Sequence, residues 1–352
     1  MNGMKQILGV TEGAFARADD DRRSFLGAAL LGLLGASLAR PSTVRGRAQS
    51  RRRPAPAGDA PNVENDDAVE RLLPALTNWG RWGKADQLGT LNYITPGRSR
   101  GAAALVRSGR AVSLAREVSV TKTEGIRRGT YEMMRDEGGS RDFVGMIFHG
   151  FAQTHLDALC HAFTPDGKMY NGFSSDEVTP QGANRLGVER MAARGVAGRG
   201  VLLDVAALKG AALQPGAPVF ISDLEAAERR QGVRVGAGDI LLVRTGAGFN
   251  NTRERRAGLH PECLTWLHKR QVALLGGDGD NDVAPLAGFE RFASAMHSVA
   301  IPFMGLPLLD NAELDALSRV CVEEERWQFL LTVAPWRFRG VTSSPVNPIA
   351  LF

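Results

Sequence analysis

The sequence predicts an α/β fold in which a sheet is covered on both faces. Four continuous apolar runs bounded by glycine or charged residues favour strands buried on both sides; they are residues 201–204, 240–244, 272–275 and 329–333. Helical patterns lie between them. Residues 222–230 open on Ser222 with Glu225 three positions later, which resembles a capping signal, and residues 262–270 follow Pro261. No internal repeat interrupts this alternation.

The first 49 residues have the pattern of a twin-arginine export signal. Arg22 and Arg23 precede an apolar run at 27–38, and an Ala/Ser/Arg-rich stretch follows it. That run is about a dozen residues long, whereas a bilayer span needs about 20, so we expect no stable membrane span in the mature form. Cleavage near Ala48 and location in the periplasm are expected; an uncleaved anchor is the alternative.

The domain organisation follows from composition. Residues 51–58 are rich in Arg, Pro and Ala, which is typical of a disordered linker. We therefore predict a signal segment at 1–49, a disordered linker at 50–65 and one folded domain at 66–352.

The basic charge of the chain is confined to the leader and linker. Residues 1–60 carry ten of the 43 Lys and Arg and five of the 38 Asp and Glu, which leaves 33 of each in the rest. The folded part is neutral by this count, and no basic stripe with interleaved aromatic residues appears in it, so nucleic acid is not a predicted partner. Cys160, Cys263 and Cys321 have no paired spacing and are expected to be buried free thiols.

Three of the six histidines lie within residues 149–161. If a helix starts near Leu156, Asp157 and His161 stand four positions apart on one face, and His155 on the preceding loop can turn to the same point. A carboxylate together with imidazoles favours Zn²⁺ or Mn²⁺ over softer ions. The alternative is structural: Asp157 caps a helix and the histidines are core residues satisfied by the backbone.

Residues 154–161 resemble the signature T-H-x-D-x-x-x-H of the cyclase family of metal-dependent hydrolases, whose members include bacterial kynurenine formamidases and isatin hydrolases. Further blocks resemble the longer bacterial members in the same order, and the similarity spans roughly residues 70–350. These blocks are residues 78–83, 88–92, 167–172, 199–204 and 238–246.

This resemblance implies a single compact β/α domain with a mixed sheet, a homodimer or homotetramer, and one or two divalent ions, Zn or Mn. It makes His155 and Asp157 metal ligands and His161 the acid/base histidine. His297 fits the family's later histidine ligand, and Asp310 stands where a glutamate is usual.

Three departures from the family pattern bear on the metal site. Phe151 stands where the first ligand histidine is usual and Gln153 replaces a glycine, which puts a second metal ion in doubt. His149 is a candidate replacement ligand, or else a capping or packing residue. Asp310 is one methylene shorter than glutamate, so we expect weaker or altered metal preference.

Two further segments are candidates for the substrate mouth. Residues 164–167 have the Pro and Gly placement of a type I turn, and the residues after it could line the mouth or lie on a surface loop: Lys168, Tyr170 and Asn171. Trp79, Arg81 and Trp82 suit an aromatic or acidic substrate, or core packing. The Gly/Asp-rich stretch 276–282 lacks the spacing of a calcium or phosphate loop, and we interpret it as a turn after a strand with Asp278 near the site.

Taken together, these patterns predict a hydrolase that cleaves an amide, a cyclic amide or a related carbonyl bond of a small molecule with a metal-activated water. Two alternatives stay open: an exported binding protein with a degenerate metal site, and a metal-dependent lyase or isomerase.

Overall fold

A computed structural model describes residues 62–118, 130–136 and 138–352. The predicted signal segment and most of the predicted linker lie outside these residues. Val63 is already buried, and the Asn65 side chain accepts a hydrogen bond from the Ala68 backbone at the start of the first helix, so packed residues begin before 66. Within the described ranges, no helix is both long and apolar enough to span a membrane.

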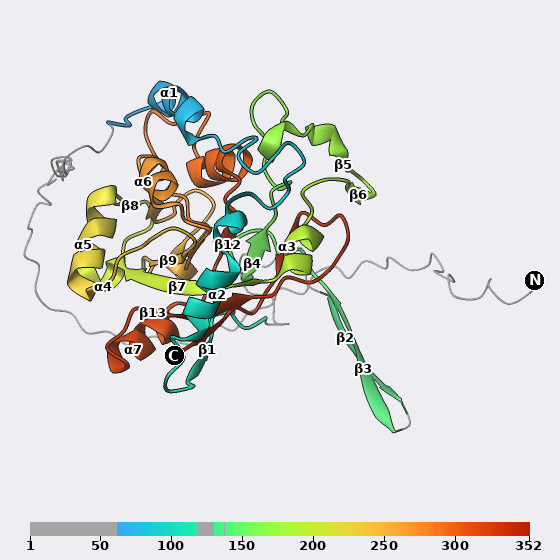
Figure 1. The fold of residues 1–352 in the computed structure, drawn as a ribbon. Coiled ribbons are helices and arrows are strands. Elements are labelled where there is room, and N and C mark those ends of the chain that lie inside the picture. The colour runs from blue at the N-terminus through green and yellow to red at the C-terminus, as the bar shows by residue number, and fades with distance from the viewer. Residues whose placement is uncertain (1–61, 119–129, 137) are drawn as a thin grey trace, which may run out of the picture. The chain divides into compact units, whose positions relative to one another are not determined.

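A mixed sheet forms the centre of the described chain (Figure 1). Its nine strands run in the order β1, β15, β13, β7, β9, β11, β12, β4, β14. The four central strands from β7 to β12 are parallel, and every other neighbouring pair is antiparallel. In sheet order the bounds are Ala111–Ser113, Ile349–Leu351, Gln328–Val333, Val196–Asp204, Ile240–Arg244, Leu274–Gly277, Leu308–Asp310, His155–Asp157 and Ser343–Pro345.

The parallel strands β7, β9 and β11 carry the core, as their apolar runs predict. The fourth predicted strand, β13, is not buried on both faces: it pairs antiparallel with both neighbours, and its residues alternate between buried and half-buried. Leu241 and Leu242 on β9 and Leu274 and Leu275 on β11 are fully buried, which requires cover on both faces of the sheet. The predicted strand at 272–275 begins two residues later than expected, at Leu274. The predicted α/β class with a mixed sheet is confirmed.

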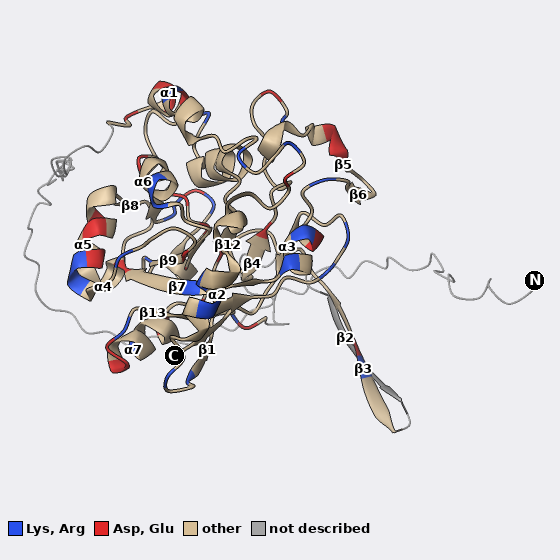
Figure 2. Ribbon diagram, in the orientation of Figure 1, with Lys and Arg blue, Asp and Glu red and all other residues tan. Residues whose placement is uncertain are grey.

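Helices occupy the connections between these strands. The two predicted helices are confirmed as α5 and α6. The capping contact of α5 differs from the predicted one of Ser222 and Glu225: the helix begins at Ile221, and the Asp223 side chain accepts from the backbone of Phe220. The α-helices are α1 (Asp66–Leu76), α2 (Pro96–Ala103), α3 (Val188–Arg194), α4 (Val205–Lys209), α5 (Ile221–Gln231), α6 (Cys263–Arg270) and α7 (Asp315–Glu323). A π-helix, η5, covers Met296–Met304. Acidic and basic side chains mix on α3 and α5 (Figure 2).

The remaining strands form three two-stranded sheets in the described residues. They pair β2 (Thr130–Asp136) with β3 (Gly139–Gly145), β5 (Val178–Thr179) with β6 (Gly182–Ala183), and β8 (Pro218–Val219) with β10 (Gly258–Leu259). Short 3-10 turns complete the secondary structure at Gly89–Tyr93, Tyr170–Gly172, Ser175–Glu177 and Gly248–Asn250.

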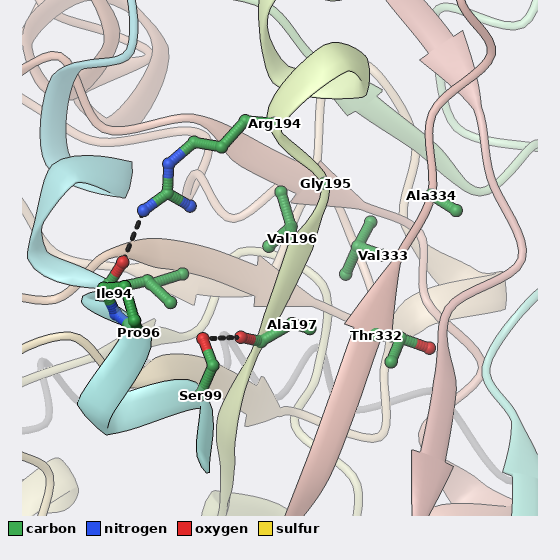
Figure 3. A pocket seen from close by; sticks show the side chains of 10 residues that line it. All are labelled: Ile94, Pro96, Ser99, Arg194, Gly195, Val196, Ala197, Thr332, Val333 and Ala334. Atoms are coloured by element: carbon green, nitrogen blue, oxygen red, sulfur yellow. Dashed lines mark hydrogen bonds between the residues drawn. The ribbon is translucent and has the colours of Figure 1, made fainter. Parts of the chain in front are cut away.

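A cavity of about 490 Å³ lies where α2 meets the start of β7 and the end of β13 (Figure 3). Arg194 on its rim donates to the backbone carbonyl of Ile94, and Ser99 donates to that of Ala197. Its lining is otherwise mostly apolar: Ile94, Pro96, Val196, Ala197, Val333 and Ala334. In the sheet order, β9 and β11 separate these strands from β12 and β4, where the histidine-rich motif lies.

Candidate metal centre

Three candidate ligands project from two paired strands. His155 on β4 lies directly opposite Asp310 on β12 in an antiparallel register, so their side chains share one face. Asp157 is two residues from His155 and shares that face by the period of a strand. Leu156 points the other way and is fully buried. The strand pattern thus places one imidazole and two carboxylates side by side.

The predicted helix starting near Leu156 is wrong. Residues 155–157 are a strand held between β12 and β14, because the segment alternates a polar and an apolar face and both neighbouring strands hydrogen-bond to it. A turn follows, in which the His161 backbone donates to Ala158. This turn still brings His161 Nε2 to 3.6 Å from Asp157 Oδ2, so the predicted meeting of the two side chains holds by a different route.

His149 comes to the same cluster from the loop before β4. Its Nδ1 atom lies 3.5 Å from Asp157 Oδ1, and its ring stacks on that of His161 with centroids 4.5 Å apart. His149 therefore lies close enough to Asp157 to take the place of the missing histidine ligand, as predicted for one of its two possible roles.

His297 arrives from the π-helix η5, a type of helix that is frequent at functional sites. Its Nε2 atom is 3.4 Å from Asp157 Oδ2 and 3.4 Å from Asp310 Oδ2. Asp310 Oδ2 is also 3.8 Å from His155 Nε2. Residues more than 130 positions apart in the sequence therefore meet at one point, as the metal hypothesis requires.

The donor set fits a divalent ion. Asp157 is fully buried, and neither of its carboxylate oxygens has a hydrogen-bond partner. Such a buried charge is costly unless a cation or donors compensate it. Two triads of potential ligand atoms share this residue: His149, His155 and Asp157, and Asp157, His161 and His297. Imidazole nitrogens with carboxylate oxygens suit Zn²⁺ or Mn²⁺.

The electrostatics of the cluster favour a positive charge at its centre. Burial alone raises the pKa of Asp157, but the imidazoles of His161 and His155 hold that pKa well below its usual value. Burial lowers the pKa of His297, yet the carboxylates of Asp310, Asp157 and Asp282 raise it well above its usual value. A carboxylate that stays ionised and an imidazole that attracts a proton both indicate a place for a cation.

The two outer histidines behave differently. Burial lowers the pKa of His149 to about 4 and lowers the pKa of His161. Both rings are therefore neutral at pH 7 and have a nitrogen lone pair available. The side chains of His149 and His161 keep 31% and 27% of their surface exposed, so both can face an incoming molecule.

The comparisons with known proteins agree with this geometry. Residues 143–281 match the model of a family described as putative cyclases. The resemblance to the cyclase family is confirmed. The crystal structure of a novel cyclase is 27% identical with a TM-score of 0.71, and the alignment covers 79% of this chain and 100% of that one.

A more distant solved structure also shares the fold. An isatin hydrolase bound to the product analogue thioisatinate is 17% identical with a TM-score of 0.50, over 72% of this chain and 97% of that one. Isatin hydrolase A from Labrenzia aggregata, bound to benzyl benzoate, is 21% identical with a TM-score of 0.49, over 74% and 98%. A search of curated proteins gives no significant match.

The two departures from the cyclase motif near β4 differ in their contacts among the described residues: the Phe151 ring has a partner, whereas the Gln153 side-chain oxygen is buried without a hydrogen bond and only the Gln153 backbone contacts the cluster. The Phe151 carbonyl accepts a hydrogen bond from Arg116, and the Phe151 ring lies under the Arg256 guanidinium at 5.8 Å. The Gln153 carbonyl is 2.8 Å from His155 Nδ1. This bond places the proton on Nδ1 and turns Nε2 towards the cluster, which is the orientation that a ligand needs.

Among the described residues, no hydrogen bond or ring contact joins the predicted substrate residues to the histidine and aspartate cluster. Tyr170 is fully buried and its hydroxyl donates to Asp86, so its prediction as a mouth residue is wrong. The Asn171 side chain ties the turn at Gly80 and Gly83.

The other two predicted substrate residues keep local contacts. Trp82 packs edge-on against Tyr93 at 5.0 Å. The Lys168 backbone donates to Thr164 in the confirmed turn, where Gly167 also donates to the Thr164 carbonyl. A substrate role for Trp82, Lys168 or Asn171 stays a prediction.

The Gly/Asp-rich stretch after β11 contributes residues that sequence reasoning missed. Asp278, the residue expected near the site, is occupied by hydrogen bonds from Thr245 and Gly246. The contact with the cluster comes instead from Asp282, whose Oδ2 lies 2.6 Å from His297 Nδ1. The concentration of acidic residues directly after a buried strand was the available signal. Spacing alone did not indicate which of these aspartates contacts the cluster.

Proposed function

We propose that this protein is a metal-dependent hydrolase that cleaves an amide, a cyclic amide or a related carbonyl C–N or C–O bond of a small molecule. The observation that carries the proposal is the buried Asp157 carboxylate, which within the described ranges has no hydrogen bond on either oxygen and is surrounded by imidazoles from residues 149–161 and from η5. The family match and the shared fold support it.

The distances permit the ligand assignment that the cyclase-family pattern implies. His155, Asp157, His297 and Asp310 would hold the ion, with His149 as a further ligand on the Asp157 Oδ1 side. Two imidazoles and two carboxylates neutralise a divalent ion and leave room for water. A bound ion would polarise a carbonyl oxygen and lower the pKa of a coordinated water towards about 7.

His161 then carries the proton. Its neutral Nε2 accepts the proton of the attacking water and returns it to the leaving nitrogen or oxygen, so the products are a carboxylic acid and an amine or alcohol. The exposed edge of this ring and its position beside Asp157 suit that role.

Metal analysis of the purified chain, together with a hydrolysis screen, tests the proposal. We expect stoichiometric Zn or Mn and turnover of at least one formylated aniline, cyclic amide or lactone. A ring-opened product is heavier than its substrate by one water, and a formylated aniline gives formate and an aniline whose summed mass exceeds the substrate by one water. His155→Ala and Asp157→Ala should each lose the metal and reduce kcat/KM by at least about 100-fold, more than the loss of an outer-shell partner usually causes.

His268→Ala is the matched control, because this histidine lies outside the cluster and contacts Asn78. It should retain metal and activity. Full metal content and full activity in His155→Ala would contradict the proposal. Wild-type protein without stoichiometric metal would favour the binding-protein alternative, and a product without added water would favour a lyase or isomerase.

A further inference from the structure

Two consecutive residues of the loop after β11 contact both candidate ligands that come from the C-terminal half. Asp282 Oδ2 lies 2.6 Å from His297 Nδ1, and Asn281 Nδ2 donates to Asp310 Oδ1 at 2.8 Å. Both residues are buried, with 1% and 3% of their surface exposed. Neither belongs to the predicted ligand set.

We propose that Asn281 and Asp282 form a positioning pair that presents His297 through Nε2 and Asp310 through Oδ2 alone. The inference rests on the proposed metal centre and assigns the geometry of two of its ligands. It makes Asp310 a ligand through one oxygen only.

The contacts of Asp282 determine which nitrogen of His297 is free. The Met296 backbone donates to Oδ1 at 2.7 Å, so Oδ2 is the oxygen left for His297. A carboxylate oxygen accepts only, hence Nδ1 carries a proton and Nε2 is the nitrogen that faces Asp157 and Asp310, where it would bind the ion.

Asn281 acts on Asp310 in the same way. Its amide nitrogen occupies Oδ1, while Oδ2 faces His297 at 3.4 Å and His155 at 3.8 Å. The shorter aspartate side chain therefore reaches the cluster with one defined oxygen. Asp310 is one methylene shorter than a glutamate, and the bond from Asn281 fixes the orientation of its carboxylate.

The backbone of the pair is fixed by its packing against β10. The Leu259 backbone donates to the Asn281 carbonyl at 2.8 Å. A Cβ atom at Gly258 would lie 2.3 Å from the Asp282 carbonyl oxygen, so only glycine allows this approach. Asn281 itself has φ of 63°, a conformation that asparagine adopts more readily than most residues.

Asp282→Asn is a sharp test because it is isosteric. The Met296 N–H holds the amide oxygen at the Oδ1 position, so the amide NH₂ faces His297 Nδ1 as a donor. That contact favours a proton on Nε2, which then cannot bind a metal. We expect Zn²⁺ affinity, measured on the full chain by competition with a chelator, to fall 10–100-fold. The visible absorption of the Co²⁺ form and the ¹⁵N shifts of the His297 ring should change with it.

Two further variants separate positioning from folding. Asp278→Asn is the same substitution in the same loop, on a carboxylate bound to Thr245 and Gly246; it should lower the melting temperature and leave Zn²⁺ affinity unchanged. Asn281→Gly tolerates the positive φ and removes only the amide, so we expect weaker Zn²⁺ binding with the His297 tautomer unchanged.

Wild-type Zn²⁺ affinity and Co²⁺ spectrum in both Asp282→Asn and Asn281→Gly would overturn the inference while leaving the proposed function intact. If Asp282→Asn does not fold, the test rests on Asn281→Gly. An unchanged Zn²⁺ affinity in that variant overturns the positioning role of the pair. Wild-type protein that binds neither Zn²⁺ nor Co²⁺ would overturn the proposed function and the inference together.

Discussion

At the scale of single residues, Asp157 organises the centre. It is the one carboxylate that both ligand triads share, and its burial would be unfavourable without a cation to balance it. The histidines around it divide into those fixed by a bond at Nδ1, such as His155 and His297, and those without such a bond, such as His161. The division sets two proposed ligands, His155 and His297, apart from the proposed proton carrier; His149, the further candidate ligand, has no hydrogen bond at Nδ1 in the described part of the chain either.

His161→Gln tests the division, because glutamine is of similar size but cannot carry the proton. We expect kcat to fall by roughly 10²- to 10⁴-fold, the usual contribution of a general acid–base. KM and metal content should change little. Steady-state kinetics and metal analysis on the same preparation check this; loss of the metal together with activity would instead make His161 a ligand.

At the scale of elements, strand register and one irregular helix build the site. The antiparallel pairing of β4 with β12 places His155 opposite Asp310, and η5 brings His297 over them. The segment before η5 is held by α1, because the Asp66 carboxylate accepts hydrogen bonds from the backbone of Glu290, Arg291 and Phe292. A helix from the start of the domain therefore anchors the chain that leads to His297.

Asp66→Asn should lower the free energy of unfolding by about 1 kcal/mol at pH 7, because a charged acceptor is replaced by a neutral one. Burial raises the pKa of Asp66, but the backbone donors of residues 290–292 and the charge of Arg291 lower it overall. A lowered folded-state pKa gives stability that is present above the unfolded pKa and is lost as pH falls through the folded pKa. The difference between wild type and variant should therefore shrink below about pH 4.

Chemical denaturation at several pH values measures this difference. Asp67→Asn is the matched control in the same helical turn, because its side chain is 73% exposed and bonds only to Arg291. It should change stability by less than about 0.5 kcal/mol. Equal losses in both variants would contradict the anchoring role of Asp66.

At the scale of the whole molecule, the charge asymmetry separates a basic leader from a neutral enzyme body. The predicted export signal lies outside the described residues. The signal, the location of the protein in the periplasm and the homodimer or homotetramer all stay proposals. Export of a folded chain would suit an enzyme that takes up its metal ion before leaving the cytoplasm.

Replacement of Arg22 and Arg23 by lysine tests the export proposal. We expect the protein to stay in the cytoplasmic fraction, because the twin arginines are the recognised feature of such signals. Arg52→Lys with Arg53→Lys, in the predicted linker, is the control and should leave export unchanged. Cell fractionation followed by immunoblotting measures both; export of the Arg22/Arg23 variant at the control level would contradict the proposal.

The amino-acid sequence by itself determined the α/β class, three buried strands of the sheet and the chemical type of the site. Apolar runs indicate burial, and the crowding of imidazole and carboxylate groups in residues 149–161 indicates a metal site. Both patterns can be seen in the sequence because each lies within a short stretch of the chain. The family match ends at residue 281, before His297 and Asp310. Their part in the site rested on resemblance until the fold placed them.

Only the tertiary structure decided how these groups meet. His155–Asp157 is a strand because two neighbours pair with it, which no local helical spacing could reveal. Tyr170 is buried and donates to Asp86, and Asp282 rather than Asp278 contacts His297. Long-range contacts thus distinguish residues that look equivalent in the sequence. Ligand geometry is a property of converging segments, so it appears only when the chain is folded.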